Sequence, residues 1–205
     1  MEIEAKFRID QPAVFAILSA LNTLDTYTLH HEPHLEQQHN TYYDTASGHL
    51  RAARYGLRTR TVDGRTLITL KGPGVAHNGI HQRMEWEFEW ADPNPATWPH
   101  ADARAQLVPI VGAEQLISIL TIQTERRHIL ALRDQQAVAE LSLDAGSITV
   151  PGKTAAFREL EIEVLPAGTE ADLDRLVAAL RQHMTLVPEN RSKLERGLEL
   201  LDPDP

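Results

Sequence analysis

Residues 1–9 read Met-Glu-Ile-Glu-Ala-Lys-Phe-Arg-Ile, in which charged and apolar side chains alternate. Successive side chains of a β-strand point to opposite faces, so the stretch predicts a strand with one charged and one apolar face. The charged face carries Glu2, Glu4, Lys6 and Arg8. Glutamate is depleted in strands, and like charges on one face repel each other. One such run is typical of an antiparallel sheet with a solvated face, whereas three such runs in one chain indicate a surface that collects cations.

Five further stretches extend this charged pattern. Two of them are acidic, with the residues Arg83, Glu85, Glu87 and Glu89 in one and Glu159, Glu161 and Glu163 in the other. Three are basic: the first carries Arg58 and Arg60, the second carries Lys71, and the third carries Thr124, Arg126 and His128. Carboxylates bind hard divalent cations, whereas arginine and lysine bind phosphate oxygens. The combination predicts a metal–polyphosphate site. The alternative is an antiparallel sheet with one solvated face.

Composition excludes several other functions. The chain has 205 residues, a formal net charge of −9 and no cysteine. An acidic protein is a poor partner for nucleic acid, whose binding needs a basic surface. No stretch approaches the 18 or so apolar residues of a membrane span, and the charged N-terminus does not resemble a secretory signal. We therefore expect a cytoplasmic protein without nucleic-acid or membrane partners; the sequence leaves open whether it is a monomer or a homodimer.

The expected elements fill one domain over residues 1–201, with a frayed tail at 202–205. Strands are expected at about 2–9, 40–45, 51–61, 66–72, 80–90, 121–132, 136–144 and 156–165. Helices are expected at about 13–24, 170–183 and 189–201, with helical pieces over 101–120 that break near Pro109 and Gly112. A polar loop is expected to carry four of the ten histidines, namely His30, His31, His34 and His39.

Eight such strands, each with one charged and one apolar face, predict an α+β fold. The strands form an antiparallel eight-stranded barrel with a charged lumen, and the amphipathic helices cover its apolar outer face. Closure also removes the exposed strand edges that promote aggregation.

The sequence resembles the CYTH, or triphosphate tunnel metalloenzyme, superfamily. Residues 2–6 match its N-terminal ExExK signature, and its other marks follow in order over nearly the whole chain. The opening, Tyr42–Thr45 and Leu50–Arg51 look most like the bacterial inorganic triphosphatase branch. The other marks are Arg58, Arg60, Lys71, Arg83, Glu85, Glu87, Arg126, Asp144, Glu159, Glu161 and Lys193.

The resemblance implies a tunnel that binds a linear triphosphate with Mg²⁺ or Mn²⁺. It assigns five acidic residues to the metal side: Glu2, Glu4, Asp144, Glu159 and Glu161. Glu85 and Glu87 would complete the metal or water network. It assigns basic residues to the phosphates: Lys6, Arg58, Arg60, Lys71, Arg83, Arg126 and Lys193. The catalytic set would be Glu2, Glu4, Lys6 and Lys71. Arg127 is the alternative to Arg126, and Glu163 continues the charged phase toward a strand end.

The resemblance implies hydrolysis of inorganic triphosphate to pyrophosphate and phosphate. Residues that bind only the triphosphate do not choose between this reaction and others. The alternatives are a thiamine triphosphatase, a nucleoside triphosphatase, a class IV adenylate cyclase and a non-catalytic polyphosphate-binding module. A barrel for an apolar ligand is disfavoured by the charged lumen. The absence of a clear aromatic clamp mildly favours a substrate without a base.

Overall fold

The computed structural model describes residues 2–77 and 80–201, so the tail expected at 202–205 lies outside the described residues. The strands are β1 Glu2–Arg8, β2 Thr23–Leu24, β3 Tyr27–Thr45, β4 Gly56–Val62, β5 Arg65–His77, β6 Ile80–Glu89, β7 Leu116–Arg133, β8 Gln136–Val150, β9 Lys153–Val164 and β10 Val187–Pro188. The helices are α1 Ala13–Ala20, α2 His49–Ala52, α3 Ala101–Val111, α4 Glu170–His183 and α5 Lys193–Leu201, with a 3₁₀ turn η1 at Pro95–Thr97.

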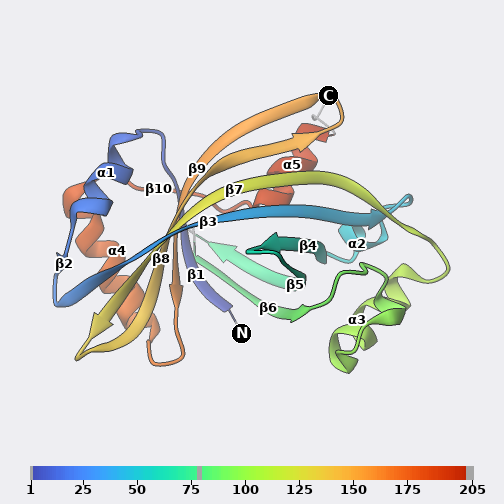
Figure 1. Ribbon diagram of the computed structural model, residues 1–205, viewed down its shortest axis with the longest axis horizontal. Helices are drawn as coiled ribbons and strands as arrows, with labels where there is room; N and C mark the ends of the chain where they lie inside the picture. Colours follow the sequence, from blue (N-terminus) through green and yellow to red (C-terminus); the bar gives the residue numbers. More distant parts are fainter. Residues whose placement is uncertain (1, 78–79, 202–205) are drawn as a thin grey trace.

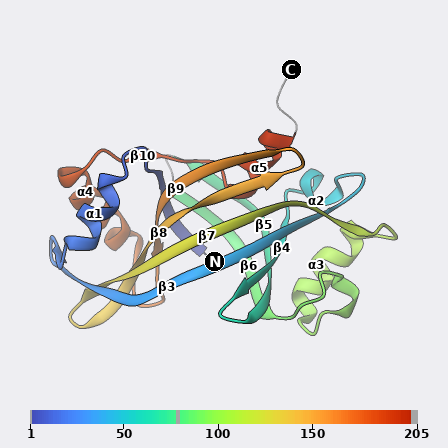
Figure 2. The same ribbon diagram turned by 45° about the horizontal axis from the view of Figure 1, so that its top comes forward.

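Eight antiparallel strands close into a ring, as the sequence predicts. The hydrogen-bonded order is β1, β6, β5, β4, β3, β7, β8 and β9, and β9 pairs again with β1. On one side of β1, Glu2 lies opposite Arg83 of β6. On its other side, Lys6 lies opposite Glu161 of β9. In Figures 1 and 2, β3, β7, β8 and β9 run along one side of the ring, with β1, β4, β5 and β6 on its other side.

The apolar outer face of this ring is covered at both ends. Phe7 of β1 is buried in one cluster with residues of α1 and α4. Leu57 of β4 is buried in a second cluster with Leu50 of α2 and Leu107 of α3. Figure 1 shows α1 and α4 together at one end of the molecule and α3 at the other. Because the apolar residues face outward to these helices, the alternating charged residues are left facing the lumen.

The last helix, α5, contacts the inner face of the strands. Leu194 packs against a cluster that contains Leu120 and Ile122 of β7, residues that share their strand face with Arg126. Gly197 permits this close approach, because a Cβ atom there would lie 2.5 Å from Leu120 Cδ2. Figure 2 shows α5 beside the hairpin of β8 and β9. The start of α5 is therefore brought to the lumen.

Several expected boundaries are wrong. The histidine-rich segment is not a loop but part of the 19-residue strand β3, because it pairs with β7 and, in part, with β4. The helix expected at 13–24 ends at Ala20, and the helical pieces expected to 120 end at Val111, after which β7 begins at Leu116. Strand β8 extends to Val150 rather than 144, and α2 replaces the start of the strand expected at 51. Long-range pairing decides these strands, and local propensity does not report it.

No helix among residues 2–77 and 80–201 is long and apolar enough to cross a membrane.

Candidate functional site

The ring encloses a cavity of about 1120 Å³ whose wall is densely charged. Its basic side chains are Lys6, Arg51, Arg54, Arg58, Arg60, Lys71, Arg83, Arg126, Arg191 and Lys193. Its acidic side chains are Glu4, Glu85, Glu87, Asp144, Glu161, Glu163, Glu195 and Glu199. Twelve of the residues expected in the site from the sequence therefore line one cavity. Of the other two, Glu159 is buried behind the wall. Glu2 belongs to β1, and the structure does not describe its side chain.

One wall of the cavity, formed by β4, β5 and β6, is mainly basic. Lys71 Nζ lies 2.9 Å from Glu85 Oε2 on the neighbouring strand. Arg60 Nη1 lies 3.6 Å from Glu87 Oε2, which also accepts a hydrogen bond of 2.8 Å from Thr69. The strands themselves position these groups, because alternate residues of β4 and β6 point inward.

Arg58 differs from the other cations of this wall. Only 9% of its surface is exposed, yet no carboxylate of the described residues forms an ion pair with it. Its Nη1 donates a hydrogen bond of 3.2 Å to the hydroxyl of Tyr42, while its buried Nε has no partner among those residues. Buried polar groups are almost always hydrogen-bonded. An unpartnered guanidinium N–H in a cavity wall therefore indicates a place for an anion.

The opposite wall contains a buried acidic trio, Asp144, Glu159 and Glu161, contributed by β8 and β9. Lys193 Nζ lies 2.9 Å from Asp144 Oδ2, 2.5 Å from Glu159 Oε2 and 2.8 Å from Glu161 Oε1. Arg126 donates two hydrogen bonds of 2.7 Å to the two oxygens of Asp144 and one of 2.5 Å to Glu161. The trio is thus paired with cations from β7 and α5.

Arg196 is a member of this network that the sequence analysis did not assign. Its Nη2 pairs with Glu159 Oε1, and its guanidinium lies 5.3 Å from the centre of the Phe157 ring. Lys193 lies 5.4 Å from the same ring. Residues three apart share one face of a helix, so the spacing of Lys193 and Arg196 on a helix was the signal that both point toward β9.

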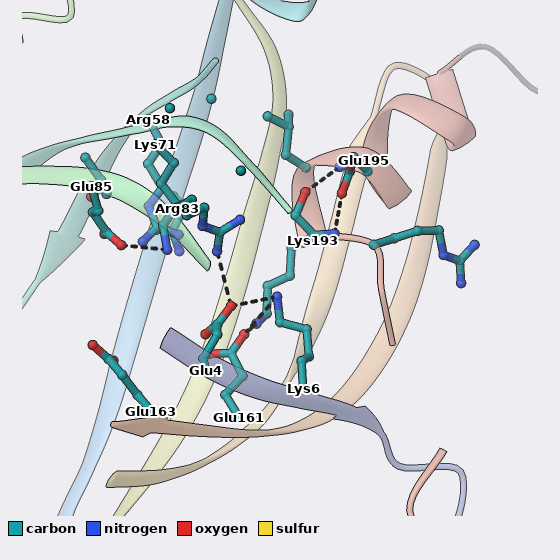
Figure 3. A pocket seen from close by; sticks show the side chains of 18 of the residues that line it. Glu4, Lys6, Arg58, Lys71, Arg83, Glu85, Glu161, Glu163, Lys193 and Glu195 are labelled. Carbon is teal, nitrogen blue, oxygen red and sulfur yellow. Dashed lines mark hydrogen bonds and ion pairs between the residues drawn. The ribbon is translucent and has the colours of Figure 1, made fainter. Parts of the chain in front are cut away.

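Glu4 and Lys6 of β1 connect the two walls. Lys6 Nζ lies 3.3 Å from Glu4 Oε1 and 3.6 Å from Glu161 Oε1. From β6, Arg83 Nη2 donates a 3.2 Å hydrogen bond to the same Glu4 oxygen. Figure 3 shows Arg83 pointing across the cavity to Glu4, with Glu161, Lys6 and Lys193 on the far side.

The network keeps its buried groups charged. Burial alone would raise the pKa of Glu161, but Lys193 and Arg126 outweigh it and hold the pKa well below its ordinary value. The pKa of Asp144 is lowered by the same two cations against the effect of burial. Burial would lower the pKa of Lys6, but the neighbouring Glu4, Glu161 and Glu159 outweigh it and raise the pKa above its ordinary value. The cavity therefore presents fixed charges of both signs.

A divalent cation suits the donor set. One oxygen from each of Asp144, Glu159 and Glu161 lies within 4.8 Å of the others, and carboxylate oxygens are the ligands that hard divalent ions prefer. These carboxylates are not isolated, however, because basic nitrogens already lie against them. An ion that used this trio would share it with those nitrogens.

The lumen face continues beyond the cavity at His128. Its Nδ1 lies 2.7 Å from Glu140 Oε1, and its Nε2 lies 3.5 Å from Glu36 Oε2. These hydrogen-bonding carboxylates raise the pKa of His128 to about 9. The alignment of Thr124, Arg126 and His128 expected from the sequence is therefore observed, and Arg126 rather than the exposed Arg127 lines the cavity. Glu36 and Glu140 were missed because their strand segments were not assigned a charged phase.

Comparison with protein families matches residues 1–198 to the CYTH domain. The inorganic triphosphatase of Haemophilus influenzae is 30% identical over 163 residues, which cover 77% of this chain and 44% of that protein. The chain therefore spans less than half the length of this relative.

Solved structures share the fold at lower identity. A Hippeastrum protein described as a candidate adenylyl cyclase with a dominant triphosphatase activity has a TM-score of 0.67 and 18% identity, over 97% of this chain and 96% of that one. A Bacillus halodurans protein described as a candidate adenylate cyclase has a TM-score of 0.65 and 21% identity, over 96% of each chain. A Pyrococcus horikoshii protein has a TM-score of 0.61 and 20% identity, over 98% of this chain and 99% of that one. Identities this low indicate the fold alone.

Proposed function

Because the chain belongs to the CYTH domain family, we propose that it is a metal-dependent triphosphatase that hydrolyses inorganic triphosphate to pyrophosphate and phosphate. The relative named an inorganic triphosphatase supports this choice of substrate. The reaction breaks one phosphoanhydride bond: water adds to a terminal phosphorus, pyrophosphate leaves, and one proton is released.

The observation that carries the proposal is Arg58. A buried guanidinium in the cavity wall has an N–H without a partner and no carboxylate of the described residues paired with it. Arginine binds phosphate through directed, charge-assisted hydrogen bonds. A phosphate oxygen at this position would accept a hydrogen bond from the free N–H. An apolar ligand would leave this N–H without a partner.

The other cations of the cavity complete the binding site for a linear anion. A triphosphate carries about four negative charges near neutral pH, and these charges must be neutralised before water can approach. Arg60, Lys71 and Arg83 approach the anion from one wall, while Lys6 and Arg126 approach it from the other. Fixed charges of this kind stabilise the transition state without reorganising during the reaction.

The carboxylates provide the metal and proton functions. Glu4 and Glu161, with Asp144 and Glu159 behind them, would hold Mg²⁺ or Mn²⁺; Glu2, Glu85 and Glu87 are proposed to support the same network. The bound ion would neutralise phosphate oxygens and lower the pKa of a coordinated water. We infer that Glu4, which is buried beside Lys6 and Arg83, orients the attacking water and accepts its proton.

The aromatic lining supports a substrate without a base. Among the described residues, the aromatic side chains of the cavity are Tyr42 and Tyr55. The hydroxyl of Tyr42 accepts a hydrogen bond from Arg58, and the hydroxyl of Tyr55 donates one of 3.1 Å to Gln106. The hydroxyl groups of both rings are thus hydrogen-bonded to residues of the protein itself. This favours inorganic triphosphate over thiamine or nucleoside triphosphates.

The test is a substrate panel with Mg²⁺ or Mn²⁺. Phosphate release is measured from inorganic triphosphate, ATP and thiamine triphosphate, and cyclic AMP is measured from ATP. We expect the highest kcat/KM with inorganic triphosphate and complete loss of activity with a chelator. Formation of cyclic AMP would instead establish a cyclase, and binding of triphosphate without any product would establish a polyphosphate-binding module.

A further inference from the structure

Lys193 occupies the centre of the acidic trio. Its ammonium nitrogen lies within 2.9 Å of one oxygen from each of Asp144, Glu159 and Glu161. One oxygen from each of these three carboxylates lies within 4.8 Å of the others, which is close enough to hold a metal ion. The ammonium therefore lies where the carboxylates would present their oxygens to a divalent cation.

The charge of this cluster is already balanced. Three carboxylates carry three negative charges, and Lys193, Arg126 and Arg196 contribute three positive charges through direct contacts. Lys6, which lies 3.6 Å from Glu161, is shared with the further carboxylate Glu4 at 3.3 Å. Asp144 and Glu159 are fully buried, so charges here interact more strongly than at the surface. A divalent ion added to the neutral cluster would face electrostatic repulsion from the cations that already occupy it.

We propose that Lys193 acts as an internal counter-ion that competes with the divalent metal and releases the carboxylates when triphosphate binds. This proposal rests on the proposed function, because the triphosphate supplies the negative charge that draws the ammonium away. Lys193 lines the same cavity as the phosphate-binding cations. Metal and triphosphate then bind with positive coupling, each increasing the affinity for the other.

Lys193 is better suited to this exchange than its neighbours. Its flexible four-carbon side chain ends in a compact charge that is able to leave one set of oxygens for another. Arg126, by contrast, is fixed by two parallel hydrogen bonds to Asp144. Arg196 pairs with the single oxygen Glu159 Oε1 and stacks on Phe157, and it is absent from the cavity wall.

The first experiment measures Mn²⁺ binding to the substrate-free protein by titration calorimetry and by the electron paramagnetic resonance of free Mn²⁺. It compares the wild type with Lys193→Gln and with Arg196→Gln, a matched control that removes the same charge from the same trio. We expect Lys193→Gln to bind Mn²⁺ roughly 5–150-fold more tightly than the wild type, the usual range of coupled binding. Arg196→Gln should show a clearly smaller gain, and Lys193→Arg should bind as weakly as the wild type.

Equal gains in Lys193→Gln and Arg196→Gln would overturn the proposal, because they would show a general charge effect. Equal affinity in the wild type and Lys193→Gln would also overturn it. If Lys193→Gln does not fold, the acetylation rate of Lys193 in the wild type is followed by mass spectrometry, with the exposed Lys153 as internal control. That rate should rise with Mn²⁺ relative to Lys153; an unchanged ratio at saturating Mn²⁺ would contradict competition. None of these assays contains triphosphate, so they remain informative if the protein hydrolyses none.

Discussion

Replacing Arg126 by glutamine removes a cation from a closed cluster of buried charges. The guanidinium of Arg126 donates two hydrogen bonds to Asp144 and a third to Glu161. Asp144 has no exposed surface, so its carboxylate depends on its protein donors for compensation. The adjacent Arg127 is exposed, and Arg127→Gln is therefore a control of identical chemistry one residue away.

The structure fixes the size of the expected effect. Breaking a buried ion pair by removing one partner costs about 3–5 kcal/mol. After the substitution, the trio keeps its contacts with Lys193 and Arg196, and Glu161 keeps Lys6 at 3.6 Å. Because Lys193 still contacts Asp144, the lower limit of about 3 kcal/mol applies. For a chain of this length that corresponds to a fall in Tm of about 6–12 °C, whereas Arg127→Gln should change stability by less than about 0.5 kcal/mol.

The assay is urea unfolding and thermal melting of the wild type and both variants without substrate. The difference between Arg126→Gln and the wild type should also depend on pH. The pKa values of Asp144 and Glu161 lie below their ordinary values of 3.8 and 4.5, so the ion pairs contribute fully above those values. Their contribution is lost as pH falls through the folded-state pKa values. Equal destabilisation by the two substitutions, or none by Arg126→Gln, would refute the inward placement of Arg126.

Three further predictions follow from individual contacts. His128→Gln should lose about 1–2 kcal/mol of stability at about pH 6, after allowance for solvent screening. Because the folded-state pKa of His128 is about 9, this loss should shrink as pH rises through that value. A loss that stays constant with pH in urea unfolding would contradict the prediction. Tyr42→Phe removes the hydroxyl that holds Arg58 and should raise KM for triphosphate about tenfold, while Tyr43→Phe, which contacts Thr59 instead, should leave KM unchanged. Gly197→Ala should destabilise the protein by about 1–3 kcal/mol in urea because its Cβ would lie 2.5 Å from Leu120 Cδ2; a gain in stability, as expected from helix propensity alone, would count against the close packing of α5.

The charged lumen could be predicted because strands have a period of two. The alternation in residues 2–8 placed Glu4 and Lys6 on one face, and the same rule placed Arg58 with Arg60. The apolar residues between them required an outer layer, which the helices provide. Local pattern was sufficient for these features because the side-chain direction within a strand depends only on the strand itself.

The rest of the site depends on contacts between distant segments. The pairing of Arg196 with Glu159 exists because Gly197 lets α5 approach β7 closely, and no local signal reports which face of the sheet a helix contacts. The histidine-rich part of β3 carries several polar residues that favour a loop by propensity. Its long pairing with β7 overrides that preference, as tertiary context commonly does in sheets.

If triphosphate is hydrolysed in the lumen, replacing the charged side chains of the lumen should remove the activity. The most direct test is kcat/KM for phosphate release from inorganic triphosphate at saturating Mg²⁺, in the wild type, Glu4→Gln and Arg58→Ala. Glu89→Gln and Arg65→Ala are matched controls, since these residues form an exposed ion pair outside the cavity. We predict a loss of about 10²–10³-fold for each lumen variant, chiefly in kcat for Glu4→Gln, and wild-type activity for both controls. Near wild-type kcat/KM in Glu4→Gln and Arg58→Ala would show that hydrolysis takes place elsewhere.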